Sequence, residues 1–269
     1  ETLAAWLAAR LSVGAAQAAA LIARGAVQVD GRRATDGSRA LPAGTRVTVF
    51  VEPVVDEAAL KLAYQDGWFL VVDKPPGVPS QATRTDSASA LDAQVQRAVP
   101  EARMMHRLDR DASGLVLFAA KAEARAPLQA ALEGGRIDRV YLAVVAGRLD
   151  GEGRVALRIA RDPSDERRRV ALPEAAPGGQ AAASRWRALA KGATATALEL
   201  RLETGRTHQL RVHLAAIGHP ILGDRLYGGP AAARLCLHAT RLALPHPRDG
   251  RPVEVRSPPP AELGVDAPP

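Results

Sequence analysis

Residues 104–121 read MMHRLDRDASGLVLFAAK, a stretch in which mixed charges stand directly before an apolar run. The apolar residues 114–121 predict a buried strand, and the charges lie at its entrance. A nearby cation favours the ionised form of a carboxylate, so Asp109, with Arg107 and Arg110 close by, could act as a nucleophile. An N-cap or an ordinary surface ion pair would explain the same residues, and the spacing alone does not decide.

The composition favours a polyanionic partner. The chain holds 36 Lys and Arg against 29 Asp and Glu, and Arg, much the commoner of the two cations, makes bidentate contacts with phosphate. A single cysteine, Cys236, excludes a disulfide framework and a multi-thiolate metal site. Neither a long apolar stretch nor a secretory pattern is present, so we expect a cytoplasmic protein without membrane association. Because Glu1 and not Met opens the sequence, we leave open that residues precede it.

Residues 1–53 have the pattern of a small separate domain. Helical periodicity covers residues 2–12 and 14–25, and alternating segments at 26–34 and 45–53 predict a small hairpin. Over the first fifty residues, six arginines stand against three acidic residues. The sequence therefore predicts a compact basic helix-helix-hairpin unit.

A second domain is predicted over residues 58–262. An apolar strand there ends in a Pro-Pro-Gly turn, and further strands are predicted at 114–121, 139–147 and 194–203. The predicted helices are fewer, at 122–133 and 205–218, and residues 161–183 predict a loop or a long hairpin. Runs of strands with scattered helices predict an α+β fold and not a doubly wound parallel sheet.

A second charged cluster, ETGRTHQLRVHLAAIGHPILGD, covers residues 203–224. A helix that begins near Gly205 would place Thr207 and Arg211 one turn apart and offer its positive end to a phosphate or carboxylate. The alternative is a solvated basic face. Its three histidines lack the i, i+4 spacing of a helical zinc site, and we expect no metal; they are His208, His213 and His219.

Taken together and in order, HRLDRDASGL, RVYLAVVAG and GRTHQLRVHLAAIGHPILGDRLYG resemble the RluA-type pseudouridine synthases. DKPPGVPS at 73–80 and LHATRLALPHP at 237–247 are similar to further landmarks of that family, so the resemblance covers roughly residues 60 to 262. It implies a catalytic domain with a mixed, mainly antiparallel sheet. The first fifty residues resemble a small RNA-binding domain shared with a small-subunit ribosomal protein.

The resemblance implies an isomerase that converts uridine to pseudouridine in RNA without a cofactor, and it implies roles for four residues. Asp109 is the expected catalytic aspartate, and Arg107 helps to displace the target nucleotide. Tyr141 stacks on the flipped uracil and is also a candidate for proton removal, and Arg211 pairs with the aspartate. Whether Asp109 attacks the sugar, attacks the ring or removes a sugar proton stays open. The further residues expected to contact RNA are Arg110, Arg206 and His208, with Arg24, Arg32 and Arg33 in the N-terminal unit.

Two departures from the family pattern leave room for an unusual substrate. Ala112 stands where the family usually has threonine, and the residues after Pro79 lack a histidine often found there. We expect a monomer that acts on ribosomal RNA in preference to transfer RNA, because an appended RNA-binding domain is commoner among ribosomal RNA enzymes of this type. Which uridine is modified stays open.

Two other functions were weighed. A non-catalytic RNA-binding or ribosome-assembly factor could use the same scaffold, but it would have no reason to keep all four residues of the expected site. An RNA glycosidase usually needs a second carboxylate, and none stands out in the sequence.

Overall fold

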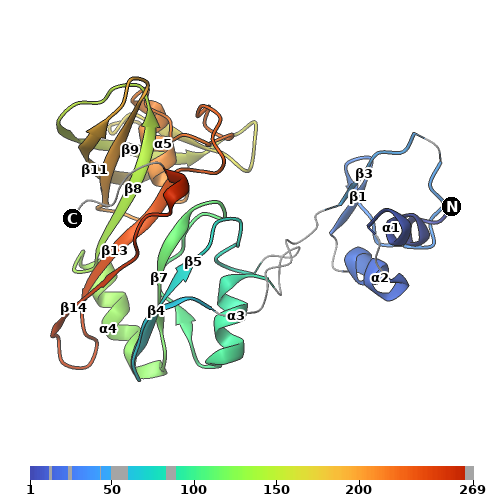
Figure 1. The fold of residues 1–269 in the computed structure, drawn as a ribbon, viewed down its shortest axis with the longest axis horizontal. Coiled ribbons are helices and arrows are strands. Elements are labelled where there is room, and N and C mark those ends of the chain that lie inside the picture. The colour runs from blue at the N-terminus through green and yellow to red at the C-terminus, as the bar shows by residue number, and fades with distance from the viewer. Residues whose placement is uncertain (12–13, 24–25, 43, 50–59, 83–88, 264–269) are drawn as a thin grey trace.

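The computed structural model describes residues 1–11, 14–23, 26–42, 44–49, 60–82 and 89–263. Figure 1 shows a small N-terminal unit and a larger part that is built on one long sheet. Positions 53 and 58, between which the sequence predicts the domain boundary, lie outside the described residues, and so does Arg24.

The N-terminal unit contains two helices and a three-stranded antiparallel sheet. Its elements are α1 (Leu3–Leu11), α2 (Ala15–Ala23), β1 (Val27–Val29), β2 (Arg32–Arg33) and β3 (Val47–Val49). Strand β1 pairs with both of the others. An apolar cluster closes between the helices and the sheet, and its buried members include Leu3, Leu7, Ala18, Val27 and Val29. In the described part of the chain this cluster shares no residue with any other cluster.

The larger part is a single sheet with the strand order β10-β9-β11-β12-β8-β13-β7-β5-β4, in which β14 also pairs with β13 and β6 with β7. Its strands are β4 (Leu62–Gln65), β5 (Phe69–Lys74), β6 (Arg103–Met104), β7 (Ser113–Ala119), β8 (Asp138–Ala146), β9 (Glu152–Arg161), β10 (Arg169–Leu172), β11 (Gln180–Lys191), β12 (Ala195–Leu202), β13 (Leu237–Pro245) and β14 (Pro252–Arg256). The helices are α3 (Leu91–Ala98), α4 (Ala122–Glu133), α5 (Gln209–Ala216) and the short 3-10 helix η1 (Ala261–Leu263).

The pairing in this sheet is antiparallel with one exception among the described strands. Strands β7 and β13 run parallel, with Ser113 opposite His238 and Gly114 opposite Ala239. The predicted α+β fold with a mixed, mainly antiparallel sheet is therefore confirmed.

Strand β7 is buried on both faces of the sheet. Leu115 and Leu117 belong to the apolar cluster that includes helix α4, whereas Val116 and Phe118 belong to the cluster that includes helix α3. Successive side chains of a strand point to opposite faces, so a strand covered on both sides reads as a continuous apolar run. This is why the segment after Asp109 has no polar alternation.

The structure corrects one predicted segment, the helix at 205–218, and adds detail to another, the loop or long hairpin at 161–183. Helix α5 begins at Gln209 and not near Gly205. The Gln209 side chain explains the difference, because its Oε1 accepts from the Thr204 hydroxyl at 2.7 Å and from the Arg206 amide at 2.9 Å. These bonds hold the preceding residues in a non-helical turn, and His208 there has a left-handed φ of 57°.

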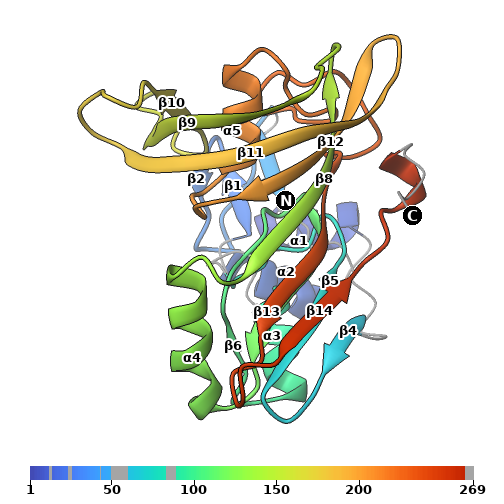
Figure 2. The ribbon, with the colours of Figure 1, turned by 90° about the vertical axis from the view of Figure 1, so that its left-hand side faces the viewer.

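The stretch 161–183, predicted as a loop or long hairpin, contains strand β10 paired antiparallel with β9. Figure 2 shows β9, β10 and β11 at one end of the sheet, where helix α5 packs against them. The turn before α5 is thereby carried on the far strands of the sheet, away from β5 and β7.

Gly114 permits the close approach of β7 to β13. Its φ is +107°, and a Cβ built on it would lie 2.3 Å from the carbonyl oxygen of Ala239. Only a residue without a side chain fits such a contact and takes this φ without strain. Gly114 thus joins the loop that carries Asp109 to the centre of the sheet.

We expect Gly114→Ala to lower the free energy of unfolding by about 3 kcal/mol or more, because the unfavourable φ alone costs about 1–3 kcal/mol and the backbone clash adds to it. Gly135→Ala is the matched control: Gly135 also has a positive φ, of +66°, but nothing lies within 4 Å of its added Cβ. That control should lose only about 1–2 kcal/mol. Denaturant unfolding of both variants measures the difference, and equal losses would contradict the close-contact argument.

Candidate active site

Asp109 lies in the loop that joins β6 to β7. Ser80 holds this loop from the side, because its hydroxyl donates to the carbonyl of Leu108 at 2.7 Å and accepts from the amide of Leu108 at 3.0 Å. Ser80 is itself buried. The backbone next to Asp109 is therefore fixed by a residue of a different loop.

Lys74, the last residue of β5, ties the same loop to the Pro-Pro-Gly turn. Its Nζ donates to the carbonyl oxygens of Pro75, Val78 and Arg110 at 2.9, 2.8 and 2.9 Å. The side chain is fully buried, and burial lowers the pKa of Lys74 to about 7, although nearby carboxylates act in the opposite sense. Because three carbonyls take its three N–H groups, Lys74 holds the two loops together.

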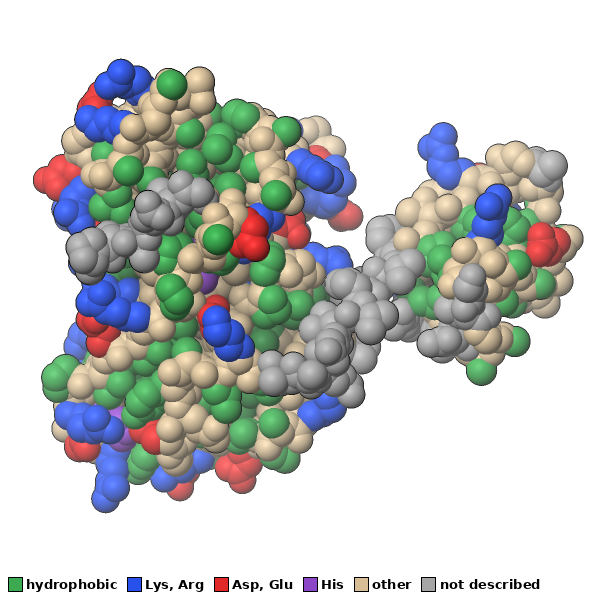
Figure 3. Space-filling model, viewed as in Figure 1, with side chains coloured by type: hydrophobic (Ala, Val, Ile, Leu, Met, Phe, Trp, Pro, Cys, Tyr) green, Lys and Arg blue, Asp and Glu red, His purple; other side chains and the backbone are tan. Residues whose placement is uncertain are grey.

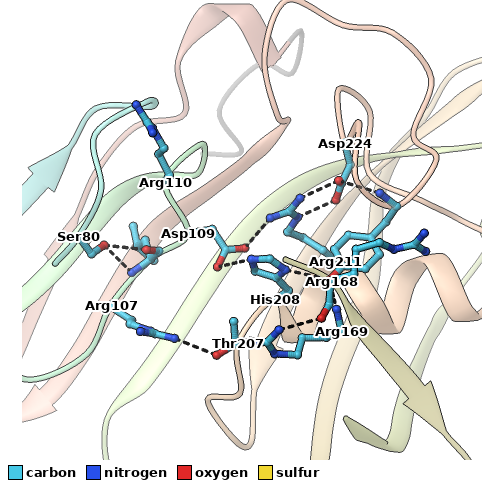
Figure 4. A network of polar contacts seen from close by, with 12 residues as sticks. Ser80, Arg107, Asp109, Arg110, Arg168, Arg169, Thr207, His208, Arg211 and Asp224 are labelled. Carbon is cyan, nitrogen blue, oxygen red and sulfur yellow. Dashed lines mark hydrogen bonds and ion pairs between the residues drawn. The ribbon is translucent and has the colours of Figure 1, made fainter. Parts of the chain in front are cut away.

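Arg211, on helix α5, binds two carboxylates at once (Figure 4). Its Nε and Nη2 donate to the two oxygens of Asp224 at 2.7 and 2.8 Å, and its Nη1 donates to Oδ2 of Asp109 at 3.2 Å. Burial alone would lower the pKa of Arg211, but the hydrogen bonds and charges of the two carboxylates outweigh it and raise the pKa above its usual value. The guanidinium therefore stays charged beside Asp109.

Asp224 orients Arg211 and cannot itself reach a substrate. Its side chain is completely buried, and Oδ1 also accepts the backbone amides of Leu226 and Tyr227 at 3.1 and 3.2 Å. Both carboxylate oxygens are thus engaged within the protein. Asp109 differs, because its side chain keeps 20% of its surface exposed.

His208 faces the second oxygen of Asp109, with Nε2 4.0 Å from Oδ1. On its other side, Nδ1 lies 2.8 Å from the hydroxyl of Tyr227, which accepts the amide of Arg169 at 2.9 Å. Burial lowers the pKa of His208, although the charge of Asp109 opposes this, and the shift favours the neutral ring beside Asp109.

Arg107 crosses from the β6–β7 loop to the turn before α5. Its Nη2 donates to the hydroxyl of Thr207 at 2.8 Å, and Nη1 lies 3.4 Å from the Gln81 side-chain oxygen. The side chain is exposed. Arg107 is thus held by neutral groups and keeps its charge available at the surface.

Tyr141, on strand β8, is 4% exposed and lines the same cavity as Asp109. Burial raises the pKa of Tyr141 to about 12, and the charge of Asp109 acts in the same sense while that of Arg139 opposes it. Its phenol is therefore protonated at neutral pH.

Two cavities flank Asp109 and Arg211. One, of about 530 Å³, is lined by residues that include Asp109, Tyr141, Arg107 and Arg206. The other, of about 740 Å³, lies on the far side of Arg211 and is lined by residues that include Arg110, Arg167, Arg225 and Arg234. Arginine side chains thus line the cavities on both sides of the Asp109–Arg211 pair.

The structure brings together most of the residues that the sequence singled out. Asp109, Tyr141, Arg211 and His208 meet at the first cavity or beside it, and Arg107 lies at its edge. Arg206 lines this cavity while its Nε donates to the Ala181 carbonyl at 3.2 Å. Arg110 points away from Asp109 in Figure 4, and its Nε donates to the Gly77 carbonyl. Arg32 and Arg33 lie exposed on β2 of the N-terminal unit, outside this group.

Sequence reasoning missed Asp224, Tyr227 and Lys74. Asp224 and Tyr227 stand in the quoted stretch GHPILGDRLYG, and Lys74 stands in DKPPG. A buried aspartate 13 positions after an arginine gives no periodic signal, and only the turn at residues 223–229 brings it back to α5. The statement that no second carboxylate stands out is corrected to this extent: Asp224 is present, but Arg211 and backbone amides occupy both its oxygens.

Neither a metal-binding cluster nor a membrane-spanning helix is present among the described residues. No group of three or more His, Cys, Asp or Glu side chains there could hold a metal ion. No helix in the same part of the chain is both long and apolar enough to cross a membrane.

Comparison with known proteins places these features in a family pattern. The model of the family described as RNA pseudouridylate synthase matches residues 68–216. An uncharacterized RNA pseudouridine synthase of Bacillus subtilis, YhcT, is 36% identical over 215 residues, which span 76% of this chain and 70% of that protein. The ribosomal large subunit pseudouridine synthase D of Nitrosomonas europaea is 37% identical over 223 residues, 77% of this chain and 64% of the relative.

A solved structure agrees in fold. Human RNA Pseudouridylate Synthase Domain Containing 1 superposes with a TM-score of 0.66 at 28% identity, covering 79% of this chain and 89% of that chain. The segment matched by the family model includes β7, β8 and α5, the elements around the candidate site.

We expect Asp224→Asn to lower the free energy of unfolding by about 3–5 kcal/mol, because it leaves the buried Arg211 without its bidentate partner. Asp138→Asn is the control. Asp138 also binds two arginines, Arg201 and Arg241, but its side chain is 36% exposed, so its loss should cost about 1 kcal/mol or less. Denaturant unfolding at neutral pH measures both, and a loss for Asp224→Asn no larger than that for the control would contradict the structural role of Asp224.

Proposed function

Because the chain belongs to the RNA pseudouridylate synthase family, isomerases that convert uridine to pseudouridine in RNA, we propose that Asp109 is its catalytic carboxylate and ribosomal RNA its substrate. The observation that carries the proposal is the pairing of the accessible Asp109 with Arg211, whose own geometry is fixed by the buried Asp224. The pairing supports a role for Arg211 in keeping Asp109 ionised and aimed at the cavity.

The proposed reaction needs a carboxylate and no additional reactant. Uridine and pseudouridine are isomers: the bond from the sugar to N1 of the base breaks, a bond from the sugar to C5 forms, the proton leaves C5, and N1 gains a proton. An ionised Asp109 is the reactive form whether it attacks the sugar, attacks the ring or removes a sugar proton. The order of these steps does not alter the residues required.

A uridine inside structured RNA has to leave its helix before its glycosidic bond becomes accessible, at a cost of a few kcal/mol. We propose that Arg107, exposed at the edge of the cavity, occupies the space that the nucleotide leaves. Tyr141 would offset the cost by stacking on the uracil, worth about 1–3 kcal/mol. With a pKa of about 12, Tyr141 starts as a neutral phenol and suits a stacking partner better than a base.

The substrate class rests on two observations. Several relatives are named ribosomal large subunit pseudouridine synthase D, and the N-terminal unit is basic. Figure 3 shows Lys and Arg side chains on both the N-terminal unit and the larger part. We propose that residues 1–53 form a separate RNA-binding domain and residues 58–262 the catalytic domain. The separate apolar cluster of the N-terminal unit supports this division.

We expect Asp109→Asn to abolish detectable pseudouridine formation and leave RNA affinity within about threefold of the parent, because affinity comes mostly from phosphate contacts. The variant keeps the size of the side chain and removes its charge. Unmodified ribosomal RNA and transfer RNA transcripts are incubated with each protein, and pseudouridine, free uracil and binding are measured.

Each outcome of this experiment separates the alternatives. Pseudouridine made by the parent in ribosomal RNA alone supports the proposed substrate. Pseudouridine made in transfer RNA alone would identify transfer RNA as the substrate instead. A parent that binds RNA without changing it is a binding factor, and one that releases uracil is a glycosidase. Clear isomerisation by Asp109→Asn would sink the catalytic role of Asp109.

We expect the double variant Arg32→Gln, Arg33→Gln to weaken RNA binding and to lower the slope of log affinity against log salt by up to about 1.8, since each lost phosphate contact removes about 0.7–0.9. Both residues are exposed on β2. The control removes two exposed arginines of the larger part, Arg136 and Arg248. A slope that falls no further than in this control would remove the support for RNA binding by the N-terminal unit.

A further inference from the structure

Two residues that line the cavity of about 530 Å³ beside Asp109 carry buried hydrogen-bond donors without partners among the described residues. These donors are Nε of Arg139 and Nδ1 of His106, both buried atoms for which the described residues offer no acceptor. Buried polar groups are satisfied in the great majority of cases, so the missing acceptor at Nε shows that the described protein does not bind the guanidinium of Arg139 from this side. The mechanism described above uses neither residue.

Arg139 is an unpaired cation in a part of the molecule where its neighbours are paired. It precedes Tyr141 by two positions on β8, so the two side chains lie on the same face of the sheet. No hydrogen bond or ion pair joins its guanidinium to any described residue, whereas Arg201 and Arg241 nearby both bind Asp138. A half-buried guanidinium without an anion is costly, and an anionic ligand would offset that cost.

The surrounding chain leaves room for this guanidinium without binding it. Gly205, in the turn before α5, faces it so closely that a Cβ at this position would lie 3.1 Å from Nη1 of Arg139. The absence of a side chain at 205 lets the guanidinium line the cavity. Arg139 thus lines the cavity beside Asp109 without an ion pair to any described carboxylate.

His106 lines the same wall without adding a charge to it. Its Nε2 accepts the backbone amide of Leu117 at 3.2 Å, so the proton of the neutral ring lies on Nδ1. Burial lowers the pKa of His106 to about 3, and the charge of Arg139 acts in the same direction. At neutral pH the ring is therefore an N–H donor and not a second cation.

The charges around the cavity favour a phosphate over a neutral group. Of its carboxylates, Asp109 is paired with Arg211, and Glu203 with Arg154 and Arg185. Glu133 is bound by Gln129, whose side-chain amide donates to it at 2.6 Å. Three arginines remain on the wall without an anionic partner among the described side chains, namely Arg107, Arg139 and Arg206.

We propose that Arg139 binds a backbone phosphate of the RNA next to the uridine that enters the site. The proposal rests on the proposed function, because it places the uridine at Asp109 and Tyr141. Two residues of a strand span about 6.6 Å, so Arg139 stands within the reach of one nucleotide from Tyr141. It would anchor the strand while the base turns.

The first test measures affinity for an unmodified ribosomal RNA transcript as a function of salt. Arg139→Gln should weaken binding about tenfold or more, as expected for a lost charge-assisted hydrogen bond, and should lower the salt slope by about 0.7–0.9. Arg136→Gln is the matched control, since it removes an exposed arginine three positions away that does not line the cavity. Arg139→Lys, which keeps the charge, should recover most of the slope.

The second test locates the phosphate. A short RNA is made that contains the uridine on which the enzyme acts. The phosphate on the 5′ side or on the 3′ side of this uridine is replaced by a neutral methylphosphonate. For the parent, one of these two replacements should weaken RNA binding about tenfold. The same replacement should not weaken RNA binding by the Arg139→Gln variant any further. If the losses of affinity from Arg139→Gln and from the methylphosphonate add at both positions, the assignment is wrong. It is also wrong if Arg139→Gln leaves affinity and salt slope unchanged and only slows the reaction at saturating RNA.

The two proposals fail separately. A parent that makes no pseudouridine in any RNA defeats the proposed function, but the salt-slope measurement depends on affinity alone and still decides whether Arg139 binds a phosphate. Thermal unfolding of each variant shows that it is folded. No described residue binds the Arg139 side chain, so its replacement leaves no group without a partner there. The melting temperature should therefore stay within about 2 °C of the parent.

Discussion

The candidate site depends on one buried cation that has to serve two carboxylates. Arg211 is only 7% exposed, and taking a guanidinium out of water costs several kcal/mol unless anions and hydrogen bonds compensate. Asp224 provides two of the three bonds, and Asp224 is in turn held by backbone amides. With Nε and one N–H of Nη2 held by Asp224, the guanidinium is fixed in orientation, and an N–H of Nη1 points to Asp109.

This constraint requires the loop of Asp109 to be held as firmly as the helix of Arg211. Ser80 and Lys74 do so from two sides, each bonding to main-chain atoms of the loop. The parallel contact of β7 with β13 at Gly114 then fixes the point where the loop enters the sheet. The mixed sheet thus brings two parts of the chain together that are 102 positions apart.

The arginines around the site fall into two groups by how they are satisfied. Arg211, Arg201 and Arg241 are bound to carboxylates and serve the architecture. Arg107 contacts only neutral groups, and Arg139 contacts none among the described residues. Because RNA competes only for cations that the protein has not already neutralised, this division supports the second group as the one that meets the proposed substrate. Composition cannot make the distinction, since the residues are chemically identical.

The sequence by itself determined the α+β class, the buried strand after Asp109, and the motifs that resemble the family, because apolar runs and ordered motifs are local properties of a chain. It also singled out Asp109, Tyr141, Arg107 and Arg211 through that resemblance. It misplaced the start of α5, because the bonds of Gln209 to Thr204 and Arg206 outweigh the local helical pattern. Only the tertiary structure decided that Asp224 would neutralise Arg211, that Lys74 would bind the β6–β7 loop, and that no described residue would pair with Arg139. Each of these depends on which distant groups the sheet brings within about 3 Å of a side chain, the range of a hydrogen bond, and no local pattern encodes such distances.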